Sequence, residues 1–175
     1  MARADFCRLL AACYYEPGTE FAEERVFDFM QQAGGRFDAQ LAASAQELGE
    51  AFAAVPLQDL LVDYTRLFLG PIDAPARPYG SVWLPGERGL MGESSIALQL
   101  LYGEAGFELS EDFRELPDHI AVELEFLYVL LFREASAQGG DDLARAREMK
   151  ARFLGKHLAA WIASFAQALR GAAQT

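Results

Sequence analysis

Apolar residues recur along this chain with the period of an α-helix. The first run places them three or four residues apart, at Phe6, Leu9, Leu10, Cys13 and Tyr14. Because an α-helix has 3.6 residues per turn, these side chains share one face, and the Pro17–Gly18 pair predicts the end of that helix. No stretch alternates apolar and polar residues as a half-buried strand does. The pattern therefore predicts an all-α fold, a helical bundle.

The first half of the chain predicts three more helices, over about 21–34, 41–55 and 57–69. Each carries apolar residues at helical spacing. Proline and glycine commonly end helices, and each of these segments is followed by one or both of them, at Gly34–Gly35, Pro56 and Gly70–Pro71.

The second half predicts three longer helical segments. Ser94 or Ser95 is expected to cap the first, and Asp118 the second, because short oxygen-bearing side chains bind the open amides of a helix start. The Gly139–Gly140 pair predicts the break before the third segment. This last segment carries large side chains on one broad face, at Met149, Phe153, His157, Trp161, Phe165 and Leu169.

Residues 70–92 interrupt the helical pattern. They contain four prolines and five glycines, at Pro71, Pro75, Pro78, Pro85, Gly70, Gly80, Gly86, Gly89 and Gly92. Loops longer than about 12–15 residues are uncommon inside compact domains and are often functional. This one also holds Tyr79, Val82 and Trp83, so we expect it to pack on apolar surface.

Composition indicates one globular domain over residues 1–175, because chains usually divide only beyond this size. Apolar residues make up 52% and charged residues 23%, which suits a packed core rather than global disorder. Fifteen basic and 26 acidic residues give a net charge of −11. Such a chain is repelled by phosphate backbones and anionic membranes, so nucleic-acid binding is excluded and basic partners are favoured.

The N-terminal region predicts neither a disulfide nor a secretory signal. Cys7 and Cys13 are six residues apart, so on a helix they point to different sides. Three charged residues among the first eight interrupt any apolar run. The longest uninterrupted apolar stretch, 126–132, is too short to span a bilayer. We therefore expect a soluble, cytoplasmic protein without membrane insertion.

Candidate catalytic groups are few. The two histidines, His119 and His157, are far apart in sequence, and His119 with Glu123 supplies only two of the three or four ligands that zinc needs. Residues 86–94 look like a phosphate-binding loop, but Glu93 stands where that loop requires lysine. We expect no metal and no cofactor, and we interpret His157 as a buried core residue.

Residues 104–125 contain eight acids and one base. Their net charge of −7 is most of the net negative charge of the chain. On a helix, Asp118 and Glu125 fall on nearly one line, with His119 and Glu123 on the next. Carboxylates grouped in this way accept hydrogen bonds from guanidinium groups. The structural alternative is a solvated acidic face with Asp118 as a helix cap.

Two short motifs resemble those of a known family. Residues 64–68, Tyr-Thr-Arg-Leu-Phe, match the aromatic-x-x-Leu-Phe signature of the TorD/DmsD/NarJ chaperones, and residues 115–119, Glu-Leu-Pro-Asp-His, match their Glu-x-Pro-Asp-His signature. Between them, residues 78–84 and 91–94 resemble the aromatic loop and following helix start of the family. The resemblance covers most of the chain beyond about residue 55, in the expected order and spacing.

This resemblance implies a TorD-like, all-helical cytoplasmic chaperone. Its partners are implied to be the twin-arginine leader and the apo catalytic subunit of a molybdopterin oxidoreductase, which it holds until the molybdenum cofactor is inserted. Premature export is thereby prevented, so any link to membrane translocase components is indirect. The charge of the chain agrees with this, because a twin-arginine leader has a basic region followed by an apolar stretch.

The resemblance also implies a set of peptide-binding residues. Glu115, Asp118 and Glu123 are expected to meet the arginines, while His119 orients Asp118 or bonds the peptide backbone. The apolar part of the leader is expected to lie on a groove formed by Tyr64, Leu67, Phe68, Tyr79 and Trp83.

Two alternatives stay open at this point. Tyr64, Leu67 and Phe68 have the spacing of ordinary core residues as well as of a groove. The Asp118, His119 and Glu123 cluster could instead serve an enzyme, either a small hydrolase or a guanine-nucleotide-dependent assembly factor. The missing phosphate-binding loop speaks against a GTPase.

Overall fold

The computed structural model describes residues 1–70, 74–86, 92–109 and 115–173. Within these ranges the chain forms ten α-helices and one π-helical turn, and its extended segments meet at one isolated β-bridge. The all-α prediction is therefore confirmed.

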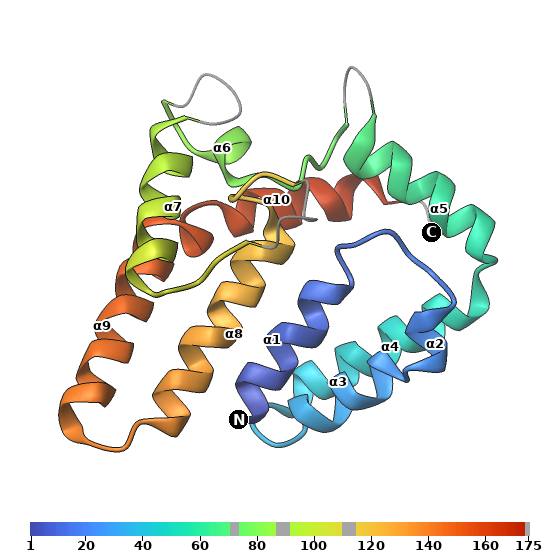
Figure 1. Cartoon of the computed structure of the whole chain (residues 1–175). Helices are drawn as coiled ribbons and strands as arrows, with labels where there is room; N and C mark the ends of the chain where they lie inside the picture. Colours follow the sequence, from blue (N-terminus) through green and yellow to red (C-terminus); the bar gives the residue numbers. More distant parts are fainter. Residues whose placement is uncertain (71–73, 87–91, 110–114, 174–175) are drawn as a thin grey trace.

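The helices follow one another along the chain as shown in Figure 1. Their bounds are α1 Ala2–Ala12, α2 Glu20–Glu23, α3 Val26–Gly34, α4 Ala39–Ala54, α5 Leu57–Tyr64, the π-helical turn η1 Thr65–Leu69, α6 Gly80–Trp83, α7 Glu93–Glu104, α8 Ile120–Ser136, α9 Gly140–Lys156 and α10 Leu158–Ala172.

Helix α1 lies between α8 on one side and α3 on the other, and it joins two apolar clusters (Figure 1). The larger cluster is centred on four side chains of α8–α10 that are at most 1% exposed: Phe126, Phe153, Trp161 and Phe165. The smaller one joins α1 to α2, α3 and α4 through Phe6, Leu9, Phe21, Val26, Met30 and Ala45. Leu10 packs against both. Burying one such side chain stabilises a fold by roughly 1.5–3 kcal/mol, so these clusters hold the helices together.

Two of the predicted helices are each divided in two. The segment predicted over 21–34 is interrupted at Arg25, whose backbone φ of 54° lies in the left-handed region, so α2 and α3 are separate helices. The last helical segment breaks at His157, with φ −124° and ψ −105°, so that α9 and α10 run in different directions (Figure 1). His157 is 6% exposed and stacks on Phe153, as its interpretation as a buried residue requires.

Two capping predictions are wrong. Helix α7 begins after Gly92 without a side-chain capping bond, and Ser95 is buried inside the helix. The cap of α8 is His119, whose Nδ1 accepts the Ala121 amide at 3.2 Å. Asp118 precedes this cap, and its carboxylate bonds to another segment instead.

The part of the 70–92 loop that the structure describes packs on the core and contains one helical turn, α6. The Ala76 amide donates to the carbonyl of Leu67 at 3.1 Å, which ties the loop to η1. Trp83 donates its indole N–H to the carbonyl of Arg77 at 2.9 Å and meets Phe165 edge-on, with ring centroids 6.1 Å apart. The predicted packing of this loop on apolar surface is therefore found in its described part.

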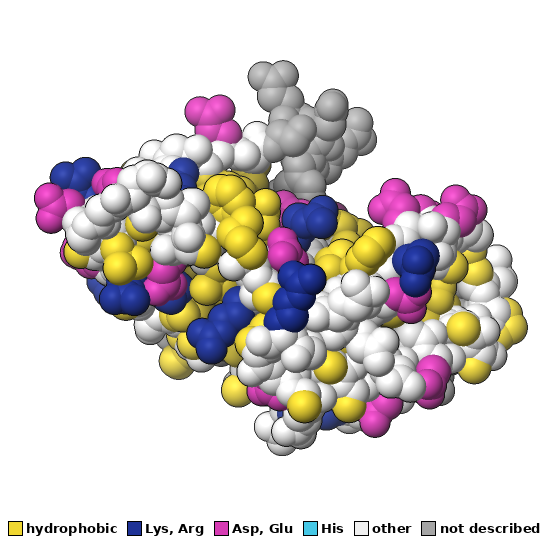
Figure 2. All heavy atoms as spheres, turned by 90° about the horizontal axis from the view of Figure 1, so that it is seen from below, with side chains coloured by type: hydrophobic (Ala, Val, Ile, Leu, Met, Phe, Trp, Pro, Cys, Tyr) yellow, Lys and Arg dark blue, Asp and Glu magenta, His cyan; other side chains and the backbone are white. Residues whose placement is uncertain are grey.

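The surface carries both charges between apolar side chains. Seen from below, several Lys and Arg side chains lie across the middle of the face, Asp and Glu side chains lie among them and toward its edges, and no histidine is visible there (Figure 2). Both histidines are buried. Of the helices described, none has the length and apolar character needed to cross a membrane.

Gly80 lets α6 approach α10 and α8 closely. An added Cβ on Gly80 would lie 2.8 Å from Nε1 of Trp161 and 3.2 Å from Oε1 of Glu123. Both neighbours are 1% exposed and sit in a packed interior, where side chains cannot move aside freely. A side chain at position 80 would therefore push the loop away from the bundle.

We expect Gly80→Ala to lower the free energy of unfolding by about 1–3 kcal/mol, as overpacking of a core typically does. Gly155→Ala in α9 is the matched control, because a Cβ there meets nothing within 4 Å. The control should be neutral or should raise stability by up to about 1 kcal/mol, since alanine favours helices over glycine. Equilibrium unfolding in urea measures both, and equal midpoints for Gly80→Ala and wild type would contradict the packing described here.

Candidate functional site

The aromatic loop at 78–84 and the 115–119 motif lie side by side. Residues Tyr79 and His119 form an antiparallel bridge. On either side of it, the Ile120 amide donates to the carbonyl of Pro78 at 2.8 Å, and the Gly80 amide donates to the carbonyl of Asp118 at 2.9 Å. The aromatic loop is thus attached to the start of α8.

Asp118 lies in the interior, at 2% exposed. Its Oδ2 accepts a hydrogen bond from the backbone amide of Ser81 at 2.8 Å, and Ser81 lies in the single turn of α6. Among the residues that the structure describes, its Oδ1 has no hydrogen-bond partner. A buried carboxylate is costly unless it is paired, so the Ser81 amide is the contact that fixes it, and its place in the fold is that of a connector between loop and helix.

Glu123 is also buried, at 1% exposed. Its Oε1 accepts the indole N–H of Trp161 at 3.1 Å. Burial raises the pKa of Glu123 well above its ordinary value, the Trp161 bond opposes this in part, and the nearby Asp118 adds to the rise. Burial therefore favours the protonated form of Glu123.

His119 is neutral and held between two tyrosines. Burial lowers its pKa, although Glu115 and Asp118 act in the opposite direction. Since Nδ1 accepts the Ala121 amide, the ring proton of the neutral form is on Nε2. The ring stacks against Tyr15 at an interplanar angle of 7° and meets Tyr79 edge-on, with centroids 6.3 and 5.4 Å away.

Two carboxylates outside this interior are each bound by a tyrosine. The hydroxyl of Tyr79 donates to Oε2 of Glu115 at 2.5 Å, and that of Tyr15 donates to Oε1 of Glu125 at 2.7 Å. Burial and these carboxylates raise the pKa of both tyrosines, which stay neutral. Among the residues described, neither Glu115 nor Glu125 forms an ion pair with a lysine or arginine.

Tyr64 belongs to the same neighbourhood. It is half-buried, and its hydroxyl lies 3.4 Å from the carbonyl of Tyr14, to which it donates. Burial raises its pKa to about 12, with further contributions from Glu115 and Glu16. We define the tyrosine–carboxylate cluster as Tyr15, Tyr64, Tyr79, Glu115 and Glu125, grouped around His119.

The other predicted groove residues are core or border the core. Leu67 is 6% exposed and is a core residue. Phe68 is half-buried; it packs edge-on against Tyr64 and Tyr14 and stacks on Phe165. Trp83 is also half-buried. These two rings therefore contact the core and expose part of their surface.

Sequence reasoning missed Tyr15 as a member of the site. It lies 110 residues before Glu125 in sequence, so no local motif links the two. The available signal was the Tyr14–Tyr15 pair at the end of an amphipathic helix, followed directly by Glu16 and Pro17. An exposed aromatic at such an end often contributes to a binding surface, since loops carry many binding residues.

A hollow of about 430 Å³ adjoins the tyrosine–carboxylate cluster. Its lining residues are Arg8, Ala12, Tyr15, Phe107, Glu125, Tyr128 and Val129. Tyr15 and Glu125 are therefore shared between the cluster and this mostly apolar hollow. A ligand that reaches the carboxylate of Glu125 can also place an apolar group beside it.

The three residues considered for an enzyme are buried. Asp118, His119 and Glu123 are at most 3% exposed, so a substrate cannot reach the cluster considered for a hydrolase. Within the described ranges, no three or more His, Cys, Asp or Glu side chains are grouped to hold a metal ion. Burial raises the pKa of Cys7 to about 11 and of Cys13 to about 12, which keeps both thiols unreactive.

The amino-acid sequence is similar to those of known proteins. The family model described as "Nitrate reductase delta subunit" matches residues 35–167, which is most of the chain. Chaperone protein TorD of Photobacterium profundum is 29% identical over 163 residues, covering 89% of this chain and 73% of the relative.

Two further relatives match shorter segments. Chaperone protein TorD of Vibrio cholerae is 29% identical over 110 residues, covering 62% of this chain and 49% of the relative. The selenate reductase assembly chaperone protein of Thauera selenatis is 42% identical over 82 residues, covering 45% and 42%. The chain thus spans about half the length of most of the curated relatives it matches.

A solved structure shares the fold. The crystal structure of a putative redox enzyme maturation protein from Archaeoglobus fulgidus superposes with a TM-score of 0.50 at 23% identity, covering 87% of this chain and 94% of the other. The matched relatives bear the names of chaperones, which supports a chaperone rather than an enzyme. With the family model matching over 35–167, the chain belongs to the TorD/NarJ family of redox-enzyme maturation chaperones.

Proposed function

We propose that this protein is a cytoplasmic chaperone that binds the twin-arginine leader, or N-terminal region, of a molybdenum-cofactor oxidoreductase subunit. It holds the apo subunit until the cofactor is inserted, and so delays export. The names of the relatives support the coarser part of this proposal, since they describe TorD chaperones and a selenate reductase assembly chaperone.

One observation carries the finer part: the tyrosine–carboxylate cluster contains two carboxylates that tyrosine hydroxyls orient and that no cation of the described residues neutralises. A guanidinium group is planar, forms paired hydrogen bonds with a carboxylate and stacks on aromatic rings. Glu115 beside Tyr79, and Glu125 beside Tyr15, each offer a carboxylate next to a ring. Two such places suit two arginines.

The charge of the surrounding segment strengthens the attraction. Residues 104–125 have a net charge of −7, and like-signed surfaces focus the field that draws a basic peptide toward them. The apolar stretch of the leader then lies on the exposed parts of Tyr64, which belongs to the cluster, and of Phe68 and Trp83, which contact the core beneath.

Asp118, Glu123 and His119 support this surface from below. Asp118 fixes the loop through the Ser81 amide, and Glu123 fixes Trp161. His119 places its ring between Tyr15 and Tyr79. In this proposal Glu115 and Glu125 bind the arginines. Asp118 and Glu123 hold in place the loop and the helix around these two carboxylates.

The binding of the arginines can be tested at Glu115. We expect Glu115→Gln to weaken binding of a twin-arginine leader peptide by about 5- to 150-fold, as loss of a charge-assisted hydrogen bond of about 1–3 kcal/mol does. Glu108→Gln, an exposed acid of the same segment, is the control and should change affinity by less than about threefold. Isothermal titration calorimetry at several salt concentrations should also show affinity falling as salt rises.

A peptide in which both arginines are replaced by glutamine completes this test. This peptide should bind the wild-type protein weakly, and its affinity should not rise when the salt concentration is lowered. Equal affinity for both peptides would contradict the assignment of the arginine site, while leaving the family membership intact.

The role of Glu123 predicts a different response. Because its pKa is raised in the folded state, the native protein binds more protons than the unfolded chain above pH 4.5, and the free energy of unfolding falls as pH rises toward the folded pKa. Glutamine resembles the protonated acid and has no such titration. We therefore expect Glu123→Gln to keep leader affinity, and to gain stability relative to wild type as pH rises above 4.5.

Thermal unfolding across this pH range, with leader affinity measured on the same samples, checks both parts. Loss of affinity in a stably folded Glu123→Gln variant would show that Glu123 meets the leader directly. A stability difference that is independent of pH would show that Glu123 is ionised in the folded protein.

A further inference from the structure

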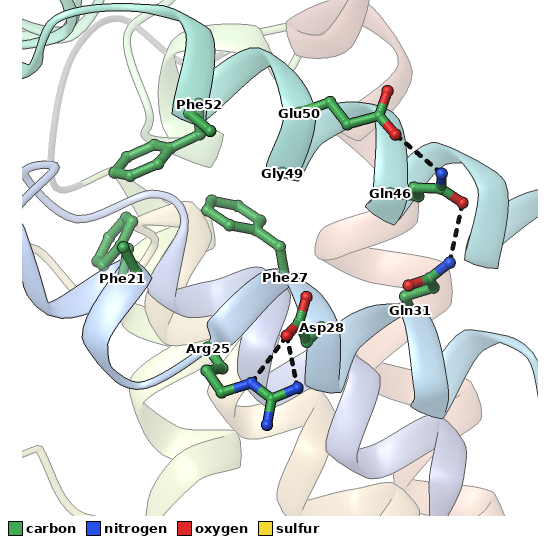
Figure 3. A pocket seen from close by; sticks show the side chains of 11 residues that line it. Phe21, Arg25, Phe27, Asp28, Gln31, Gln46, Gly49, Glu50 and Phe52 are labelled. Carbon is green, nitrogen blue, oxygen red and sulfur yellow. Dashed lines mark hydrogen bonds and ion pairs between the residues drawn. The ribbon is translucent and has the colours of Figure 1, made fainter.

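An open groove lies between α3 and α4, with α2 at one end. It encloses about 640 Å³, within the range of ligand sites in proteins. Figure 3 shows it from close by, with three phenylalanine side chains at one end and amide and carboxylate groups at the other. It belongs to the smaller apolar cluster, and no residue of the tyrosine–carboxylate cluster lines it.

The apolar end is formed by Phe21, Phe27 and Phe52. The ring of Phe52 lies 5.8 Å from that of Phe21 and 5.1 Å from that of Phe27, measured between centroids. Phe27 and Phe52 are only half-buried, so part of their surface faces the groove. Gly49 of α4 faces Phe27 without a side chain, and a Cβ there would come within 2.8 Å of the Cβ of Phe27. The two helices therefore approach closely beneath the exposed rings.

The polar end is a chain of hydrogen bonds across the two helices. Gln31 of α3 donates to Gln46 of α4 at 2.9 Å, and Gln46 donates to Glu50 at 2.8 Å (Figure 3). On the α3 side, Arg25 pairs with Asp28 at 2.8 Å, so these two charges offset each other. Glu50 leaves the lining of the groove with a net negative charge.

The helices around the groove also carry a net negative charge. Residues 20–54 contain seven acids and two bases, a net charge of −5. A strongly acidic surface around a groove favours a basic occupant and disfavours an anionic one. The apolar rings require that this occupant also present apolar side chains.

We propose that this groove binds a basic amphipathic helix of a partner protein. The apolar face of such a helix lies on the rings of Phe21, Phe27 and Phe52, as helices do when they bind hydrophobic grooves. A lysine or arginine one or two turns along it reaches Glu50. A polypeptide fits better than a compact small molecule, because the apolar and acidic ends follow one another along the line between α3 and α4. This site is separate from the proposed leader site and goes beyond it.

The probe for this proposal is a blocked helical peptide of about 15 residues, since shorter isolated helices are marginal in water. It carries leucines at i, i+3, i+4 and i+7, lysines on the flanks of that face, and no arginine. A second probe replaces every lysine with glutamate. Fluorescence anisotropy at low salt should show saturable binding of the lysine peptide, with binding of the glutamate peptide at least about tenfold weaker.

Two variants locate the binding. Glu50→Lys reverses the charge at the polar end and should lower the affinity for the lysine peptide by about fivefold or more. Glu47→Lys makes the same change on an exposed position of α4 that does not line the groove, and its effect should be less than about twofold. Ala53→Trp, at an exposed residue of the lining, fills the apolar end and should weaken binding by more than about tenfold.

Leader binding separates this proposal from the proposed function. Glu50→Lys and Ala53→Trp should leave affinity for the twin-arginine peptide unchanged, whereas Glu115→Gln should leave the lysine peptide unaffected. The proposal is overturned if the lysine peptide does not bind saturably, if both peptides bind equally, or if Glu47→Lys weakens binding as much as Glu50→Lys does.

Discussion

The bond from the Ser81 amide to the buried carboxylate of Asp118 is the contact on which the proposed leader-binding surface depends. It fixes the first turn of α6 at the start of α8, beside the bridge between Tyr79 and His119. That placement brings Gly80 against Trp161 and Glu123 in the interior. Burying a carboxylate this deeply costs free energy unless the group is well paired. The chain nevertheless buries Asp118 at the point where a proline- and glycine-rich loop must be held in one position.

This constraint divides the acidic residues into two groups with different physical roles. Asp118 and Glu123 are buried, and burial raises the pKa of Glu123, which favours its protonated form. Glu115 and Glu125 lie farther out, where tyrosine hydroxyls orient them. Binding surfaces gain affinity when their groups are already in place before the ligand arrives. In the proposed function, Asp118 and Glu123 supply that order, and Glu115 and Glu125 supply charge for a basic peptide.

Much of the fold follows from the sequence, and the exceptions have physical causes. Helical spacing predicted the principal helices, but it did not predict the left-handed backbone of Arg25 or the break at His157, because neither residue is a glycine or a proline. The 115–119 motif singled out Glu115, Asp118 and His119, yet spacing alone cannot distinguish a buried Asp118 from an exposed one. Tyr15 escaped notice because its partner Glu125 is 110 residues away. Periodicity likewise left Leu67 undecided between core and groove, and burial places it in the core.

Native-state hydrogen exchange at Gly80 and Ser81 tests most directly whether this surface is ordered before the leader binds. Both amides donate to Asp118, one to its carbonyl and one to its carboxylate. The account predicts that both are protected in the free protein, that a leader peptide changes their exchange little, and that Asp118→Ala removes the protection of Ser81. Rapid exchange of Ser81 in the free wild-type protein, with protection gained only when the leader binds, would contradict it.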